Sequence, residues 1–347
     1  MRDPELETLM PLLLELILKS VVLIFVLLTG FAYMSLVERK ALARLQARIG
    51  PNRAGPFGLM QPLADGLKLI VKESITPKAV DLPVYFLAPV LVVVPALILF
   101  AVIPVGKTDL LQLASKVNVG VLYLLGVMGV AVYGIVLAGW ASNNKYASLG
   151  GLRASAQVLS YELGMGLAIV AVVLMAGSMS LADIVNAQFP MHYGGVLGWF
   201  IFRQPVAAMV FAVTALAETM RAPFDLVEAE QELTAGYMTE YSGMKFALFF
   251  MAEYVKMIAV SGMFVTFFLG GWAGPGVEAD PTGLLSLVYF TIKVIACLLL
   301  MILVRATLPR VRYDKLMAIG WKTLIPVTLA NIVITAVLIV AGVPGYK

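Results

Sequence analysis

Cysteine and histidine are almost absent from this chain of 347 residues, which contains one of each, Cys297 and His192. A single cysteine cannot build a disulfide within the chain, an iron–sulfur cluster or a structural zinc site. A single histidine excludes a haem ligated by two histidines of this chain. We therefore expect this chain alone to bind no metal and no redox cofactor, so a partner must carry out any electron transfer.

Charge is also scarce, because charged residues make up 13% of the chain and hydrophobic residues 61%. A soluble domain of this length could not hide so much apolar surface, whereas a lipid bilayer can. Only helices satisfy their own backbone groups in lipid without closing a barrel. The composition predicts an all-α integral membrane protein, with residues 1–347 forming a single membrane domain. The net charge of +4 is too small to indicate nucleic-acid binding.

Apolar runs long enough to cross a bilayer recur along the chain and predict about eight transmembrane helices. The predicted spans are residues 10–37, 82–105, 119–141, 157–177, 197–217, 244–270, 284–306 and 323–343. The loops that would share one side of the membrane, here called the inside loops, are residues 38–81, 142–156, 218–243 and 307–322.

Basic residues predict which side these loops face. Most lysines and arginines fall in the inside loops or at the span ends next to them. The opposite side holds only Arg2, Lys107, Lys116, Arg203 and Lys347. Positive charge accumulates on the cytoplasmic side of membrane proteins, so we expect the inside loops to be cytoplasmic, or to face the matrix in a mitochondrion.

The first inside loop contains a predicted amphipathic helix over residues 58–73. Leu59, Leu63, Leu67 and Ile70 recur at helical spacing and form an apolar face. Such a helix can lie on the lipid headgroups, or it can form the floor of a cavity that opens to lipid. Asp65 discriminates between the two, because a carboxylate gains nothing from an anionic membrane surface.

The third inside loop, residues 218–243, is unusually acidic and is called the acidic loop below. With the span ends beside it, it carries Glu218, Asp225, Glu228, Glu230, Glu232, Glu240 and Glu253. The only bases between residues 216 and 254 are Arg221 and Lys245. Crowding and desolvation favour the protonated form of a carboxyl group. Glu162 adds a further carboxylate near the start of the fourth span.

Two interpretations of these carboxylates are open. Each could simply pair with a nearby base, as Glu253 would with Lys256 at i, i+3. Alternatively, carboxylates at span ends mark ion or proton routes. Pairing explains Glu240 and the Glu15–Lys19 pair, but not the whole group, since the nearby loops are short of bases. We therefore favour a proton-handling role.

Four motifs are long and specific enough to identify a family. They are ERKALARLQARIGPNRAGPFGLMQPLADGLKLIVKE at 38–73, SYELGMGL at 160–167, ALAETMRAPFDLVEAEQELTAGYMTEYSGMKFALFFMAEY at 215–254, and RATLPRVRYDKLMAIGWK at 305–322. In sequence and order they resemble the quinone-site membrane subunit of respiratory complex I, known as NADH dehydrogenase subunit 1 or, in bacteria, as the H subunit of NADH-quinone oxidoreductase. The resemblance covers essentially the whole chain.

The resemblance implies a subunit of the proton-pumping NADH:quinone oxidoreductase that has no redox centre of its own. It implies a tunnel, formed with soluble quinone-site subunits, that admits ubiquinone from the bilayer. FMN and iron–sulfur clusters would belong to partner subunits, and adjacent small membrane subunits would also be partners. The implied location is the bacterial cell inner membrane, or the mitochondrial inner membrane.

The resemblance also assigns residues to two groups. The quinone-tunnel residues would be Glu38, Arg39, Arg48, Asp65, Phe224, Asp225 and Arg305, with Arg305 as a charged neighbour of Asp65. The proton-path residues, coupling quinone reduction to proton translocation, would be Glu162, Glu218, Glu228, Glu230, Glu253 and Tyr254.

Two other functions use the same features. A stand-alone proton-linked carrier could employ these carboxylates, and it would be stable and active when purified alone. A related subunit of membrane-bound hydrogenases would share the scaffold without handling quinone. The complete motifs at 38–57 and 216–254 favour the quinone-tunnel subunit.

Overall fold

The structure, a computed structural model, describes residues 4–108, 111–114, 117–189, 198–225, 236–278 and 280–343, with side chains from residue 13 onward. This part of the chain is helical and contains no strand. Its α-helices are α1 (Pro4–Leu45), α2 (Gln61–Val71), α3 (Leu82–Ile98), α4 (Gly120–Ala141), α5 (Lys145–Ala176), α6 (Leu181–Ala187), α7 (Phe200–Arg203), α8 (Pro205–Glu218), α10 (Met244–Phe268), α11 (Leu284–Thr307), α12 (Tyr313–Ala318) and α13 (Ile325–Val340).

Four shorter helical segments complete this description. They are the 3₁₀ turns η1 (Pro56–Gly58), η2 (Leu99–Ala101) and η5 (Gly236–Met238) and the π-turn η6 (Ile319–Leu324). The π-turn joins α12 to α13, so residues 313–340 run as one helix long enough to cross a membrane.

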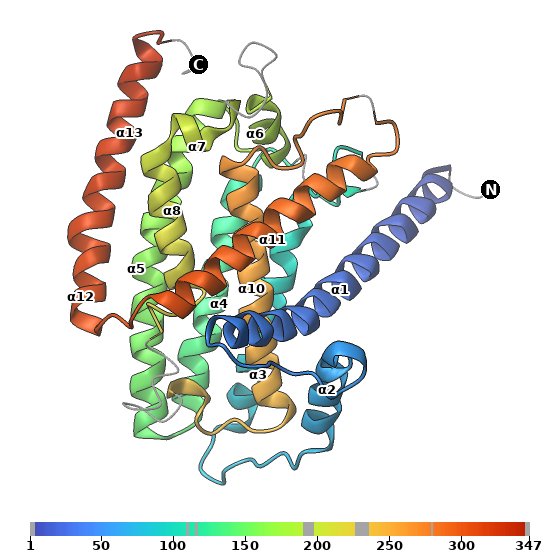
Figure 1. The fold of residues 1–347 in the computed structure, drawn as a ribbon, viewed down its shortest axis with the longest axis vertical. Helices are drawn as coiled ribbons and strands as arrows, with labels where there is room; N and C mark the ends of the chain where they lie inside the picture. Colours follow the sequence, from blue (N-terminus) through green and yellow to red (C-terminus); the bar gives the residue numbers. More distant parts are fainter. Residues whose placement is uncertain are drawn as a thin grey trace.

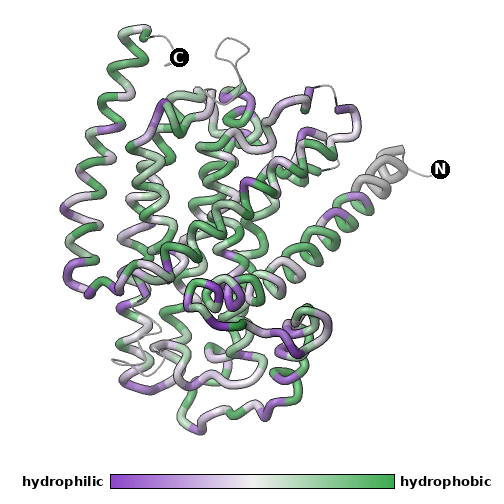
Figure 2. Tube along the Cα trace, viewed as in Figure 1, coloured by the Kyte–Doolittle hydropathy of each residue, from purple (hydrophilic) through white to green (hydrophobic). Residues whose placement is uncertain are grey.

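Seven helices of the described chain are long and apolar enough to span a bilayer. They are Leu13–Leu45, Leu82–Ala101, Gly120–Ala141, Lys145–Ala176, Met244–Phe268, Leu284–Thr307 and Tyr313–Val340. The remaining predicted span, 197–217, corresponds to α7 and the shorter apolar helix α8. The prediction of an all-α membrane protein is confirmed, and hydrophobic residues cover the long helices in Figure 2.

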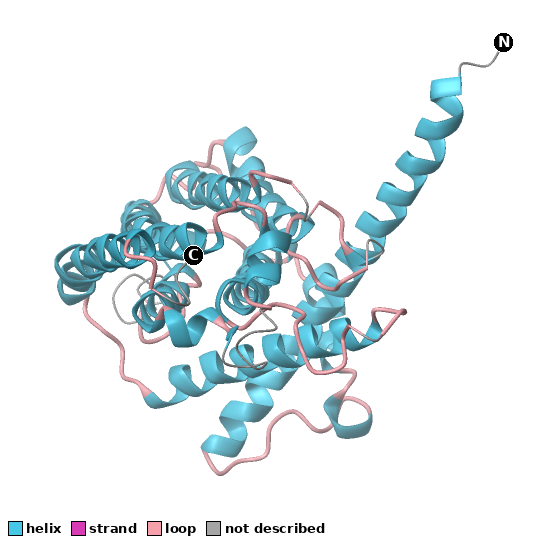
Figure 3. Ribbon diagram, turned by 90° about the horizontal axis from the view of Figure 1, so that it is seen from above, coloured by secondary structure: helices cyan, strands magenta, loops and turns pink. Residues whose placement is uncertain are grey.

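Helix α10 is the centre of the bundle. It is 67% buried over its most apolar stretch, against 17% for α1 and for the α12–α13 helix at the periphery. Helix α11 crosses α10 obliquely, and α1 leaves the bundle toward its N-terminal end (Figures 1 and 3). The peripheral helices therefore expose most of their apolar side chains to lipid, as expected for a bundle whose solvent is a bilayer.

Helices α3 and α4 approach closely because α4 carries small residues on the facing side. A Cβ at Gly134 would lie 2.9 Å from the carbonyl oxygen of Ala88 on α3. Small residues allow such close backbone approach, and the van der Waals packing that results helps to hold helices together in lipid. This close pair forms one wall of the cavity described below.

The predicted amphipathic helix is confirmed as α2, with Pro62 in its first turn. Its apolar residues Leu63, Leu67 and Ile70 are 55–62% exposed in the isolated chain. Helix α2 lies below the inner end of α1, beside the chain segment that leads to α3 (Figure 1).

Two helices extend further than the apolar runs predict. Helix α1 continues to Leu45, beyond the predicted end at residue 37. Helix α5 begins at Lys145, so most of the predicted inside loop 142–156 is its first part. The extension of α1 matters for function, because it carries Glu38.

Candidate functional site

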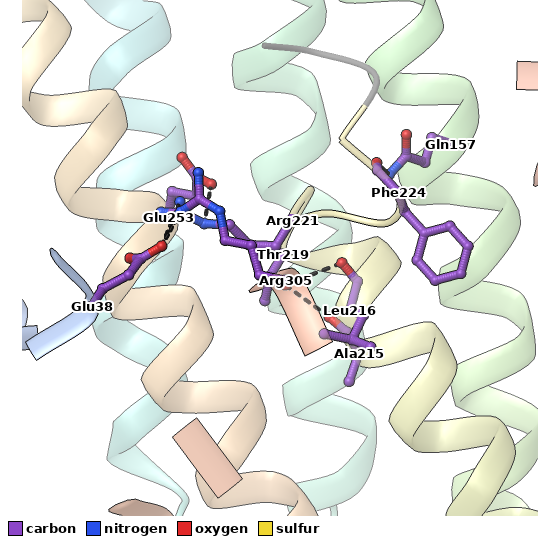
Figure 4. A network of polar contacts seen from close by, with 9 residues as sticks. All are labelled: Glu38, Gln157, Ala215, Leu216, Thr219, Arg221, Phe224, Glu253 and Arg305. Carbon is purple, nitrogen blue, oxygen red and sulfur yellow. Dashed lines mark hydrogen bonds and ion pairs between the residues drawn. The ribbon is translucent and has the colours of Figure 1, made fainter. Parts of the chain in front are cut away.

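Four charged side chains from distant parts of the sequence meet in a buried network. Glu38 comes from α1, Glu253 from α10, Arg305 from the end of α11, and Arg221 from the turn after α8 (Figure 4). Arg221 Nη1 lies 3.5 Å from Glu38 Oε1, and Arg221 Nε lies 2.8 Å from Glu253 Oε1. Arg305 Nη1 also donates to Glu38 Oε1. One arginine is thus shared between two glutamates.

Burial makes this network energetically sensitive. Glu38 is 3% exposed and Arg221 4% exposed. The two carboxylates and two guanidinium groups balance in charge, which is how buried ions are tolerated. Arg221 also stacks over the rings of Tyr254, at 4.5 Å, and Phe250, at 6.0 Å. These aromatic faces favour the cationic group and hold it between the carboxylates.

A second buried ion pair lies nearby, where α8 meets α10. Lys256 Nζ is 2.6 Å from Glu218 Oε1, and the Glu218 side chain is fully buried. Glu218, Glu253 and Lys256 line one cavity between α3, α4, α8 and α10, which is otherwise mostly apolar. Its volume of about 30 Å³ is enough for about two water molecules. The cavity therefore connects the second ion pair to the four-residue network.

Glu162 on α5 is the fourth carboxylate of the site. It is half-buried and lies within electrostatic range of both Glu218 and Lys256. Gly129 on α4 leaves room for it, because a Cβ at that position would lie 3.3 Å from Glu162 Oε1. Glu162 therefore continues the row of carboxylates that begins at Glu38 and passes through Glu253 and Glu218.

Asp65 on α2 joins the inner end of α1 by an ion pair nearer the surface. Its carboxylate lies 2.7 Å from Arg39 Nη1 and 3.7 Å from Lys68 Nζ, and it accepts a hydrogen bond from Gln61 at 3.1 Å. Arg305, expected as a charged neighbour of Asp65, donates to Glu38 on α1. Adjacent residues of α1 thus hold α2 and α11.

Comparison with known proteins gives the family. The family model for NADH dehydrogenase matches residues 18–336. The chain is 49% identical to an H subunit of NADH-quinone oxidoreductase from Koribacter versatilis, in a match covering 94% of this chain and 97% of the relative. It is 49% identical to the corresponding protein of Rhodospirillum rubrum, over 92% and 93% of the two chains.

The chain belongs to the H-subunit family of NADH-quinone oxidoreductase. Another member, from Protochlamydia amoebophila, is 50% identical over 89% of this chain and 92% of its own length. Membership makes this chain a membrane subunit of an enzyme complex, with other subunits of complex I as partners and a quinone as the substrate. The predicted resemblance is confirmed.

In this complex I subunit, the remaining predicted residues fall in different places. Tyr254 belongs to the network through its ring contact with Arg221. Phe224 is buried, with its ring 5.6 Å from that of Tyr161, and the adjacent Asp225 is half-buried. Arg48 is exposed after the end of α1 and donates to Gln46. The predicted proton-path residues Glu228 and Glu230 lie outside the described residues.

The sequence alone did not predict how the basic residues of the site pair with its carboxylates. Lys256 pairs with Glu218, whereas the simple pairing predicted it beside Glu253. Arg221, counted only as a loop base, is shared by Glu38 and Glu253. The positions of Arg221 and Lys256 could have indicated these ion pairs, because charged residues within or next to membrane spans need partners. Among the described residues, no group of histidine, cysteine and carboxylate side chains is gathered to hold a metal ion.

Proposed function

We propose that this chain forms the membrane part of the tunnel that admits ubiquinone from the bilayer, and that its carboxylates couple quinone reduction to proton translocation. The soluble quinone-site subunits would complete the tunnel. FMN and the iron–sulfur clusters would lie in partner subunits, while this chain binds no cofactor alone. The shared position of Arg221 between Glu38 and Glu253 is the observation that supports the proposal best.

The tunnel mouth would lie where α1, α2 and α10 meet. The Arg39–Asp65 ion pair fixes α2 beside α1, and α2 also contacts α10. The exposed apolar residues of α2 suit contact with a hydrocarbon tail at the membrane surface. Glu38 directly precedes Arg39 on α1 and contacts Arg221, so it would link the tunnel mouth to the buried network.

Coupling would start when reduced quinone brings negative charge near Glu38 and Arg305. That charge competes with the carboxylates for the arginines, and at separations of 3–4 Å in a poorly screened site the competition is strong. A carboxylate that loses part of its attraction to Arg221 favours its protonated form. Because Arg221 is shared, a change at Glu38 reaches Glu253 without any large movement.

The proton path would continue through the cavity that Glu253 and Glu218 share. Lys256 sits beside Glu218 and within electrostatic range of Glu162, so protonation at one member changes the proton affinity of the next. Tyr254 would hold Arg221 in place. From their position in the sequence, Glu228 and Glu230 would extend the path toward the adjacent membrane subunits.

The proposed location is a bacterial cell inner membrane, since the relatives compared above are bacterial. A mitochondrial inner membrane would suit the same topology. The basic inside loops would face the cytoplasm or the matrix, following the usual distribution of positive charge. The soluble quinone-site subunits would dock on that side, over the network and the tunnel mouth.

Turnover of the assembled complex in membranes tests this proposal. Glu218→Gln should lower both NADH-driven reduction of added quinone and proton pumping by tenfold or more, in the range by which proton-transfer groups accelerate reactions. Glu15→Gln is the control, because Glu15 also forms an ion pair with a lysine, Lys19 at 2.7 Å, but on the more exposed N-terminal part of α1. Normal turnover and pumping in Glu218→Gln, at normal assembly, would refute the coupling role.

The same preparation separates the alternative functions. A tunnel subunit should co-purify with flavin and iron–sulfur proteins, and the parent complex should reduce quinone. Activity of the chain purified alone would support a proton-linked carrier instead. A parent complex that evolves or consumes hydrogen without reducing quinone would support the hydrogenase alternative.

A further inference from the structure

Gln157 is a fully buried amide on α5 that the proposed proton path does not use. Its Nε2 donates to the carbonyl oxygens of Ala217 and Phe224, both at 2.8 Å. Both amide hydrogens are therefore used. Ala217 directly precedes Glu218, and Phe224 directly precedes Asp225. One side chain thus fixes the backbone beside two of the candidate carboxylates. Figure 4 shows Gln157 beside Phe224.

Two further contacts lie on the same face of α5. The ring of Tyr161, one turn after Gln157, packs against Phe224. Gly150, two turns before Gln157, approaches the far end of the acidic loop, where a Cβ on Gly150 would lie 2.6 Å from the Cα of Gly236. One face of α5 therefore contacts the acidic loop on both sides of its undescribed part.

The same helix carries Glu162, five residues after Gln157. The distance from Glu162 to Glu218 therefore depends on how α5 holds the end of α8. The amide of Gln157 makes this connection and stays neutral at every physiological pH. Its hydrogen bonds are thus unaffected when neighbouring carboxyl groups gain or lose protons.

We propose that Gln157 is a positioning residue for proton coupling. It holds Glu218 and the start of the acidic loop at a fixed place on α5, so that Glu218 and Glu162 keep the spacing that proton exchange requires. This inference rests on the proposed function, and it adds a residue that carries no charge and exchanges no proton itself.

The test is Gln157→Leu in the assembled complex in membranes, with Gln188→Leu as the matched control. Gln188 is also buried and donates to two backbone carbonyls, those of Ile184 and Thr266, at 3.2 and 2.8 Å. It follows α6, at the opposite end of the bundle from α2 (Figure 1). Turnover is expressed per assembled complex, using NADH oxidation by an artificial acceptor to count complexes.

Gln157→Leu should lower quinone turnover about tenfold and lower pumping with it, because two ordinary hydrogen bonds no longer fix the geometry. The KM for quinone should stay near wild type, since the tunnel mouth is untouched. Gln188→Leu should leave turnover per complex unchanged. If Gln157→Leu does not assemble, Gln157→Asn, which keeps both donors on a shorter side chain, should show a smaller loss of the same kind.

A pH profile of Gln157→Glu separates positioning from simple stability. The new carboxyl group would face two carbonyl oxygens, so its ionisation repels them, and turnover should fall further as pH rises. The deficit of Gln157→Leu should not vary with pH. If Gln157 had a purely structural role, each variant would yield fewer assembled complexes. Those complexes would show the wild-type turnover, KM and pH profile, and that result would overturn the proposal.

The outcome is separable from the proposed function. Loss of turnover in Glu218→Gln together with wild-type turnover in Gln157→Leu would refute only the positioning role. Wild-type turnover in both variants would refute the coupling function itself.

Discussion

Removing the ammonium group of Lys256 would leave Glu218 as a buried carboxylate without its partner at 2.6 Å. Breaking a buried ion pair on one side typically costs ~3–5 kcal/mol, unless the remaining carboxyl group takes up a proton. At 1.4 kcal/mol per factor of ten, this corresponds to roughly a hundredfold or greater change in the folded-to-unfolded ratio. Lys256→Met should therefore shorten the thermal-inactivation half-life of the complex and lower its yield.

The double variant Glu218→Gln, Lys256→Met separates stability from coupling. Replacing a whole buried ion pair by neutral groups of similar size is often neutral or stabilising, so most of the lost stability should return. Quinone turnover should not return, because no group at position 218 can then exchange a proton. Both quantities are measured on the same membranes, as half-life at fixed temperature and as turnover per complex.

Recovery of both stability and turnover in the double variant would show that the pair is only structural, and the coupling argument would fail. Wild-type stability of Lys256→Met alone would contradict the inferred burial cost. The control is Lys19→Met on α1, whose partner Glu15 has a side chain that is 56% exposed. An exposed pair of this kind contributes about 0–1 kcal/mol, so this change should be nearly silent.

Two further predictions concern the ends of the site. Arg39→Ala should raise the KM for long-tailed quinones more than for short-tailed ones, because Arg39 fixes α2 at the proposed mouth through Asp65. Equal effects on both kinds of quinone would exclude a role of Arg39 at the tunnel mouth. Gly129→Ala should reduce turnover several-fold by crowding Glu162. Gly126→Ala is the control and should not reduce turnover, because a Cβ at Gly126 would have no neighbouring atom within 4 Å. Equal turnover in the two variants would refute the crowding argument.

Much of the fold could be predicted because a segment that crosses a bilayer must be a long apolar helix, and such runs are easy to see in a sequence. Seven of the predicted spans correspond to long apolar helices, and the amphipathic helix forms where the spacing of its apolar residues predicts it. The apolar runs ended α1 too early and began α5 too late. Such runs report the thickness of the hydrocarbon layer, whereas α1, at 42 residues, is about 63 Å long at 1.5 Å per residue.

Part of the candidate site could be predicted as well. The sequence singled out Glu38, Glu218 and Glu253, and the structure brings these carboxylates into one buried region. It did not single out Gln157, because a neutral residue in an apolar run gives no signal of charge. Its two backbone partners lie 60 and 67 residues away, and no periodicity relates them.

A helical membrane protein, its family and a set of carboxylates near the ends of its spans all follow from the order of the amino acids. The sharing of Arg221 by Glu38 and Glu253, and the pairing of Lys256 with Glu218, become visible only in the folded chain. Composition and spacing indicate which segments are apolar enough to lie in lipid, and this is a local property of each helix. The choice of ionic partner depends on the depth and crossing of α1, α8, α10 and α11, which is fixed only when all four pack together.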